Sequence, residues 1–353
     1  MKKAIIADIS SLSYEGKIYG HFVKAASLFK NVMDEEYNVI VAGSKEYRLN
    51  FAPDVLLELP FSRIKEEKKS KRKKITDFLG ELRNTRYVLA KNSEVLIFQS
   101  YSKLPIYLGL MIFPKKAKHI YMIEYQKTNY SGAAYWLQRQ GLSKIDGVIT
   151  SNEAVGEYFK TNYVVIPDYF YVEPVEIQNM TPRYDFGIIG TVANDKMYED
   201  VVSSLEGSSY TLIIAGKFMD QDRFKRITEM AGKNITIIDK YLTDEEYKEI
   251  LMNCRFMVLP YNPAKYSGKS SGVVLDALYN NKPVIVPRID SFDFVEQYGV
   301  GVVYDNSFSE IVNLKDENLN DKNYSCAISA FNSDMKRKTV RFLEFIRGDK
   351  KWK

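Results

Sequence analysis

Short apolar runs alternate with amphipathic or polar segments along almost the whole chain. This alternation is typical of parallel β-sheets whose strands are connected by crossover helices. In the first half, strands are expected at 4–7, 38–42, 55–59, 95–99, 119–123, 147–150 and 163–166. Helices are expected between them at 20–33, 65–91, 104–112 and 133–142.

The alternation lapses and restarts near the middle of the chain. A polar segment contains Pro167, Pro174 and Pro182, and a new strand pattern begins at Asp185. Further strands are expected at 186–189, 211–215, 235–238, 256–259, 284–286 and 302–304. The sequence therefore predicts an N-terminal α/β domain over 1–168, a linker over 169–182, a C-terminal α/β domain over 183–324, and a closing helix with a basic tail over 325–353.

The expected helix 65–91 has apolar periodicity only in its later part. Ile75, Phe78, Leu79 and Leu82 fall at helical spacing, so we expect them to form the face that packs on the core. The basic residues before them lack this spacing. We expect that basic run to project beyond the core.

The composition excludes several classes of protein. The 353 residues are 45% hydrophobic and 27% charged, with two cysteines, which argues against a disordered chain, a collagen or a disulfide scaffold. The longest uncharged apolar run, 104–114, is far shorter than the roughly 20 residues of a membrane-spanning helix. We expect a cytoplasmic protein whose membrane contact, if any, is peripheral at the inner face of the cell membrane.

The positive charge is concentrated in one short stretch. The twelve residues 63–74 hold eight basic and two acidic side chains, whereas the whole chain has a net charge of only +5. A solvated helix start, a patch for an anionic membrane surface and a nucleic-acid site are three interpretations. The last is disfavoured because no aromatic residues for base stacking are interleaved with the charges. The basic residues are Arg63, Lys65, Lys68, Lys69, Lys71, Arg72, Lys73 and Lys74.

A small, hydroxyl-rich loop leads into an expected helix near residue 272. Free backbone N–H groups and the positive end of the helix dipole make such a junction an anion site, most often for phosphate. Ser270, Ser271 and Gly272 would approach the anion, Lys269 would add a positive charge, and Asp276 could accept hydrogen bonds from a ribose. An ordinary helix capped by its own serines is the alternative.

Two common nucleotide motifs are absent from the chain. Neither G-x-x-x-x-G-K-[ST] nor G-x-G-x-x-G occurs, which argues against an ATPase and an ordinary NAD enzyme. The chain has only two histidines, which alone cannot form a metal site. We therefore predict that the protein requires no metal ion.

The segment 276–285, Asp-Ala-Leu-Tyr-Asn-Asn-Lys-Pro-Val-Ile, resembles the donor-site motif of GT-B fold glycosyltransferases of the E-x7-E, family-four-like group. The resemblance runs in order through the second domain, at 186–192, 196, 212–216, 241–243 and 255–260. It implies two Rossmann-like, doubly wound domains that face a cleft, with the C-terminal helix packing back toward the first domain.

The resemblance also implies a function. A sugar would pass from a UDP- or GDP-linked donor, a substrate rather than a cofactor, to a glycan or lipid-linked glycan acceptor in bacterial surface polysaccharide or glycoconjugate assembly. Residue by residue, it places Lys196 and Gly190 at the donor diphosphate, Tyr241 and Leu242 at the base, Ser270, Ser271 and Gly272 at the phosphates, and Asp276 at the ribose.

Two positions depart from the family pattern. Gly268 replaces the first glutamate of E-x7-E, and Thr191 replaces the arginine that usually follows the glycine at 190. Lys269 is expected to supply the lost positive charge beside the leaving diphosphate. The departures keep open a non-catalytic GT-B partner of another transferase. A nucleotide-sugar epimerase is less favoured, because such an enzyme would need more cleft histidines than this chain offers.

The first domain resembles the acceptor half of the same fold more loosely. The loop after the first strand would face the cleft and includes Gly16, Gly20 and His21. Glu124, at the end of an expected strand, would look into the cleft and act as a general base on an acceptor hydroxyl. Alternatively, Glu124 caps the next loop or pairs with Lys127.

Overall fold

A computed structural model shows that the chain divides into two compact units. Unit 1 comprises Met1–Phe170 and Lys336–Lys353, and unit 2 comprises Tyr171–Met335. The structure describes residues 1–14, 17–18, 22–64, 70–151, 153–167, 170–171, 181–192, 195–267, 271–314, 319 and 324–348. No helix in these ranges is long and apolar enough to cross a membrane.

Unit 1 is built on a seven-stranded sheet in the order β10-β9-β8-β7-β1-β4-β5, with every neighbouring pair parallel. The strands are β1 (Lys2–Ala7), β4 (Tyr37–Gly43), β5 (Leu56–Glu58), β7 (Ser93–Phe98), β8 (Ala117–Ile123), β9 (Gly147–Thr150) and β10 (Tyr163–Val165). The helices are α1 (Phe22–Met33), the short 3-10 helix η1 (Lys45–Leu49), α2 (Lys71–Leu89), α3 (Leu104–Ile112), α4 (Gly132–Leu142) and α5 (Glu153–Phe159).

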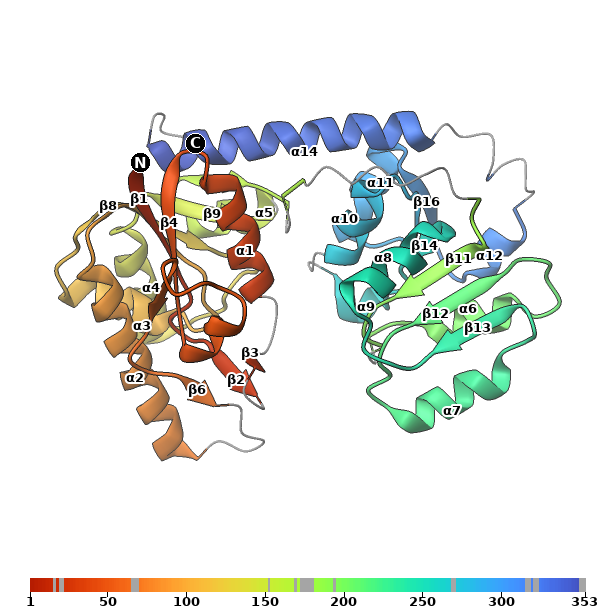
Figure 1. The fold of residues 1–353 in the computed structure, drawn as a ribbon, viewed down its shortest axis with the longest axis horizontal. Helices are drawn as coiled ribbons and strands as arrows, with labels where there is room; N and C mark the ends of the chain where they lie inside the picture. Colours follow the sequence, from red (N-terminus) through yellow and green to blue (C-terminus); the bar gives the residue numbers. More distant parts are fainter. Residues whose placement is uncertain are drawn as a thin grey trace. The chain divides into compact units, whose positions relative to one another are not determined.

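Alternating residues of β1 belong to two cores, one on each face of the sheet. Ala4 and Ile6 pack with α1 and with the end of α14 (Tyr324–Arg347), the long C-terminal helix. Ile5 and Ala7 pack with side chains from α2, α3 and α4, which lie on the other face (Figure 1). Period-two burial of this kind produces the doubly wound arrangement.

Unit 2 repeats the plan with six parallel strands in the order β13-β12-β11-β14-β15-β16. The strands are β11 (Tyr184–Ile189), β12 (Leu212–Ala215), β13 (Ile235–Ile238), β14 (Cys254–Val258), β15 (Val284–Pro287) and β16 (Gly301–Tyr304). The helices are α6 (Tyr198–Ser204), α7 (Gln221–Met230), α8 (Asp244–Met252), α9 (Pro263–Tyr266), α10 (Gly272–Tyr279), η2 (Asp290–Phe292), α11 (Asp293–Tyr298) and α12 (Ser309–Val312).

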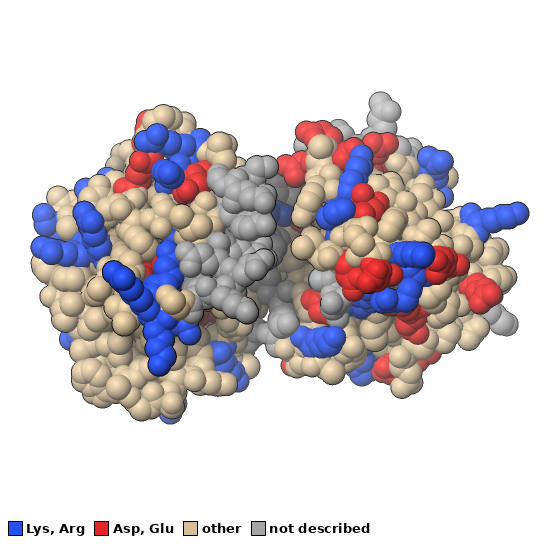
Figure 2. Space-filling view, turned by 90° about the horizontal axis from the view of Figure 1, so that it is seen from below, with Lys and Arg blue, Asp and Glu red and all other residues tan. Residues whose placement is uncertain are grey.

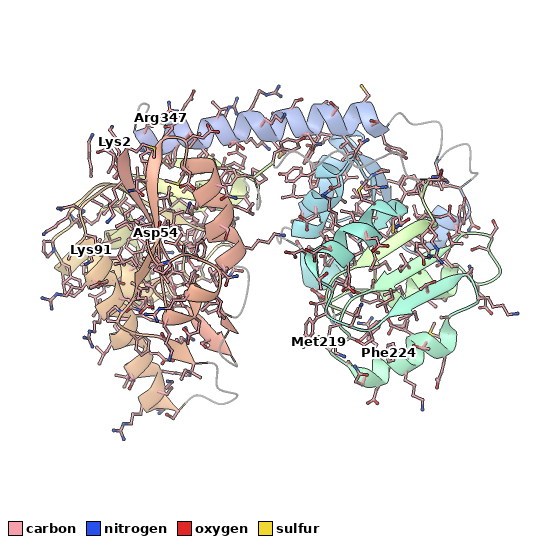
Figure 3. All side chains as sticks on the ribbon, in the orientation of Figure 1. Lys2, Asp54, Lys91, Met219, Phe224 and Arg347 are labelled. Atoms are coloured by element: carbon pink, nitrogen blue, oxygen red, sulfur yellow. The ribbon has the colours of Figure 1, made fainter. Side chains whose placement is uncertain are left out.

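The C-terminal helix α14 contributes to both units. Its first half packs in unit 2, where Phe331 stacks on Phe294, and its last turns pack in unit 1. There Tyr121 donates a hydrogen bond to the carbonyl of Phe345, and the guanidinium of Arg347 (Figure 3) pairs with Glu36. The closing helix is therefore part of the core of the N-terminal unit.

The predicted alternation of strands and crossover helices is confirmed in both units. A small third sheet was not predicted; it joins β2 (Leu12–Tyr14), β3 (Lys17–Ile18) and β6 (Arg63–Ile64). Its strands are two or three residues long, which is too short for a period-two pattern to stand out.

The predicted core face of α2 is wrong for two of its four residues. Ile75 and Leu79 are 62% and 57% exposed, whereas Phe78 and Leu82 are half-buried. The buried stripe of the helix instead carries Asp77, Glu81 and Asn84. Helical spacing showed that α2 is amphipathic, but neighbouring polar groups decide which side faces inward.

Candidate functional site

Two glycines shape the carboxyl edge of the sheet in unit 2. Gly190 follows β11 with φ of 106°, and Gly216 follows β12 with φ of 151°. A Cβ atom on Gly216 would lie 2.0 Å from the carbonyl oxygen of Gly190, so the two loops meet backbone to backbone. The nearest atom to a Cβ on Gly190 would be Cγ2 of Val273, at 4.0 Å, which places this backbone beside the first turn of α10.

The start of α10 is not capped by its own serine. Ser271 occupies the N-cap position but makes no capping hydrogen bond with its side chain. Its buried hydroxyl lies 3.0 Å from the hydroxyl of Tyr261 instead. The self-capped alternative therefore does not hold for Ser271, and the positive end of the helix keeps its capacity for an anion.

Lys196 lies across the same edge from α10. Its Nζ donates to the carbonyl of Thr191 at 3.3 Å and lies 5.3 Å from the ring centroid of Tyr261 and 5.8 Å from that of Tyr198. Burial lowers the pKa of Lys196 to about 8. Aromatic faces stabilise its positive charge, and a nearby anion would do so more strongly.

Asp276 is held by a side chain from another helix. One carboxylate oxygen accepts a hydrogen bond from the hydroxyl of Tyr247 on α8 at 3.1 Å, and the aspartate is half-buried. Tyr241 and Leu242 precede the capping box of Thr243 and Glu246 that begins α8. Tyr241 is 73% exposed, so its ring is open to stack on a flat ligand, and Leu242 is half-buried.

A cavity of about 460 Å³ opens beside Lys196, at the starts of α6 and α7. Arg223 in its wall is bound by Glu199, with Nε donating to Oε1 at 2.8 Å, and Nη2 donates to the carbonyl of Lys196 at 2.6 Å. Its lining is Lys196, Met197, Glu199, Asp200, Arg223, Arg226, Asn262 and Asn306. Arg223 thus fixes the backbone that carries Lys196.

The structure brings together most of the predicted donor-site residues that it describes. Gly190, Thr191, Lys196, Ser271 and Gly272 converge through the contacts above. Other predicted residues lie outside the described part of the chain, namely Lys269, Ser270, Gly16, Gly20 and His21, as does Gly268.

The sequence analysis did not predict three tyrosines that lie at the carboxyl edge of the sheet in unit 2. Tyr198, Tyr247 and Tyr261 support Lys196, Asp276 and Ser271, respectively. The chain has 26 tyrosines, so residue type alone gave no signal. Tyr261, which lies three positions beyond the end of β14, would have been found by inspecting every strand end.

In unit 1, Glu124 follows β8 directly but is enclosed. It is 2% exposed, so the expected exposure to a cleft is not observed. Its carboxylate lies 3.4 Å from the ammonium of Lys103 and accepts a hydrogen bond from Tyr107 at 3.2 Å, and burial raises its pKa. The partner is therefore Lys103 rather than Lys127.

A second buried carboxylate, Asp8, follows β1. It accepts hydrogen bonds from the hydroxyl of Tyr47 at 2.8 Å and from the amide of Ser10 at 3.2 Å, and burial raises its pKa to about 6. The hydroxyl of Ser10 in turn accepts from the amide of Tyr101 at 3.0 Å. These bonds tie together the loops that follow β1 and β7.

The basic residues of the stretch 63–74 differ in their surroundings. Arg63 lies in β6 and pairs with Asp77 and Glu81, and Lys73 pairs with Asp77. The side chains of Lys71, Arg72 and Lys74 are exposed, whereas Lys65, Lys68 and Lys69 lie outside the described residues. Within the ranges described, no group of three or more His, Cys, Asp or Glu side chains could hold a metal ion.

Comparisons with known proteins bear on this architecture. No protein-family model matches the chain, and no curated protein matches it. Among solved structures, Anabaena HepE in complex with UDP aligns over 98% of this chain and 99% of its own, with a TM-score of 0.64 and 11% identity. AviGT4, a glycosyltransferase involved in avilamycin A biosynthesis, aligns over the full length of both chains, with a TM-score of 0.63 and 13% identity.

The chain has the GT-B fold. A glycosyltransferase from Rickettsia africae also aligns, over 99% of this chain and 96% of its own, with a TM-score of 0.65 and 11% identity. The likeness covers both Rossmann-like units and α14. At these identities it establishes the fold, and the residues must carry the argument for function.

Proposed function

We propose that this protein is a glycosyltransferase that moves a sugar from a UDP- or GDP-linked donor to a glycan or lipid-linked glycan. The setting would be the assembly of bacterial surface polysaccharide or glycoconjugates. The observation that carries the proposal is the convergence at one sheet edge of Lys196, the Gly190 backbone and the start of α10, where Ser271 makes no capping hydrogen bond. The binding of UDP by Anabaena HepE, which shares the fold, supports the donor class.

The proposed chemistry breaks the bond between the anomeric carbon and the donor diphosphate. Negative charge develops on the leaving phosphate, where the ammonium of Lys196 and the α10 terminus would stabilise it, assisted by Lys269. Ser270, Ser271 and Gly272 would contact the phosphates, Asp276 the ribose hydroxyls, and Tyr241 and Leu242 the base. No metal ion is assigned a role.

The new bond forms between the anomeric carbon and an acceptor oxygen, whose proton must leave. We propose Glu124 as the general base, and burial raises its pKa in that direction. Because its carboxylate is 2% exposed and bound by Lys103 and Tyr107, these two side chains must move aside before it can reach an acceptor hydroxyl. The loop that contains Gly16 and His21 would contribute to the acceptor side.

A non-catalytic partner of another transferase is the second candidate, favoured by Gly268 and Thr191 at two family positions. A thermal-shift screen of nucleotides and nucleotide sugars separates the two. We expect UDP or GDP and one of their sugars to raise the melting temperature, and Lys269→Ala to abolish the shift. The absence of a shift with every compound would favour the non-catalytic partner.

An epimerase on the same fold is tested in the same mixtures. Product analysis of the bound sugar nucleotide without an acceptor should recover the sugar unchanged. Recovery of its epimer would replace the transferase proposal.

A further inference from the structure

The earlier part of helix α2 is packed with its polar side inward. Its buried residues there are Asp77, Glu81 and Asn84, whereas Val88 and Leu89 join the apolar core near its end. The guanidinium of Arg63 lies 3.5 Å from Asp77 and 3.1 Å from Glu81. The amide of Asn84 donates to the carbonyls of Ile9 and Phe61, both at 2.9 Å. These bonds fix the rotation of the helix about its axis.

The opposite stripe of α2 is therefore turned to the outside. Ile75 and Leu79, one turn apart, are 62% and 57% exposed. The last residue of β6, Ile64, is 59% exposed. An isolated exposed apolar side chain is common, but an apolar pair at the centre of an outward helical stripe is not. The stripe continues with Arg72, Thr76, Arg83 and Arg86, all exposed.

All charged side chains on the outer face of α2 are basic. Asp77 and Glu81, the only acidic residues of the helix, are buried and paired with Arg63. Lys71, Arg72 and Lys74 are exposed at its first turn. In Figure 2, the basic side chains of unit 1 stand mostly among uncharged neighbours, whereas acidic and basic side chains alternate on unit 2.

We propose that the outer face of α2 binds the surface of an anionic lipid bilayer. Ile75 and Leu79 enter the boundary between headgroups and acyl chains, and Lys71, Arg72 and Arg83 contact lipid phosphates. Basic residues beside apolar ones on one helical face are the signature of an interfacial helix. The stripe carries no aromatic side chain, so it lacks a stacking platform for nucleic acid.

This interaction is separate from the proposed transfer reaction. It would hold unit 1 at the surface where lipid-linked acceptors are found. Because the donor-site residues belong to unit 2, membrane binding and nucleotide binding can be measured independently in the same variants.

Flotation of the full chain with vesicles tests the proposal. We expect binding to phosphatidylcholine vesicles that contain roughly 30% phosphatidylglycerol, little binding to pure phosphatidylcholine, and a loss at high salt. Ile75→Gln with Leu79→Gln, and Lys71→Gln with Arg72→Gln and Arg83→Gln, should each reduce the partition coefficient about tenfold or more.

The matched control changes three other exposed lysines of unit 1, Lys115→Gln, Lys116→Gln and Lys118→Gln, and should bind like the wild type. Circular dichroism melts and nucleotide affinity verify that each variant is folded. Equal flotation of all variants, or none with the wild type, would overturn the proposal. So would a dimer in light scattering that dissociates in the Ile75, Leu79 variant, because a second copy would then cover this face.

Discussion

At the scale of residues, the environment of Lys196 makes a prediction about pH. Its pKa is lowered to about 8 by burial, and a bound diphosphate would raise it again. The protonated lysine is the form that binds phosphate, so nucleotide affinity should fall as the pH rises above 8. We expect the Kd to increase about tenfold between pH 7 and pH 9 in calorimetry.

The variant Lys196→Met should bind more weakly and lose this pH dependence. Lys225→Met, on the exposed side of α7, is the matched control and should keep the wild-type profile. A profile that is flat in the wild type, or unchanged in Lys196→Met, would show that Lys196 does not meet the phosphates.

The contact between Asp8 and Tyr47 predicts a pH-dependent stability effect. The tyrosine hydroxyl donates to the carboxylate, and burial raises the pKa of Asp8 to about 6. Above pH 6 the hydrogen bond from Tyr47 stabilises an ionised carboxylate. Below pH 6 the carboxyl group is neutral, and the same hydrogen bond stabilises it less. Tyr47→Phe should therefore lower the free energy of unfolding by about 1–3 kcal/mol at pH 7.5, and by less at pH 5.

Urea unfolding at the two pH values measures this difference. Tyr304→Phe is the control, because Tyr304 is also buried and its hydroxyl has no hydrogen-bond partner among the described residues. An equal loss at both pH values for Tyr47→Phe would mean that packing, not the carboxylate, explains the contact.

Lys196 was predicted from the family resemblance, whereas Glu124 was predicted from its place at the end of an expected strand. Glu124 does follow β8. Its partner Lys103 could not be found, because it precedes α3 and reaches Glu124 only in the folded sheet. The missed tyrosines illustrate the same limit, since their role depends on contacts between separate elements.

At the scale of elements, α2 depends on an ionic cluster for its attachment. Arg63→Gln would leave Asp77 and Glu81 buried without the guanidinium that neutralises them. We expect a loss of about 3 kcal/mol in the free energy of unfolding, measured by urea titration. Arg48→Gln, which removes an exposed ion pair with Glu58, should cost less than about 1 kcal/mol. Equal losses of stability in Arg63→Gln and Arg48→Gln would show that the ionic cluster does not fix the orientation of α2.

The inverted packing of α2 could not be predicted from its periodicity. Apolar and polar stripes both recur at helical spacing, and hydrophobicity alone selects the wrong one. The decision comes from Arg63 on β6, a strand of two residues that the apolar pattern does not reveal. Longer elements with continuous apolar runs, such as β9 and α3, were predicted with the bounds that the structure shows.

At the scale of the whole molecule, the alternation of strands and helices was enough to predict two parallel α/β units. The family resemblance predicted that the C-terminal helix packs back toward the first domain, and this is confirmed by the end of α14 in the core of unit 1. The residue at which α14 passes from one core to the other could not be predicted, because its apolar face is continuous in sequence.

The transfer reaction is expected to proceed without a divalent cation. Positive charge from lysines and a helix terminus would stabilise the diphosphate instead. Nucleotide release in the presence of donor and acceptor should therefore be unchanged after treatment with EDTA. A loss of release that manganese restores would contradict this prediction.

The central claim is that unit 2 binds a nucleoside diphosphate between Lys196 and the start of α10. Titration calorimetry of the full chain with UDP and with GDP tests it most directly. We expect one of the two to bind at a single site, and Lys196→Met to raise its Kd at least about tenfold at pH 7. No binding heat with either nucleotide, or the same Kd in Lys196→Met as in the wild type, would contradict it.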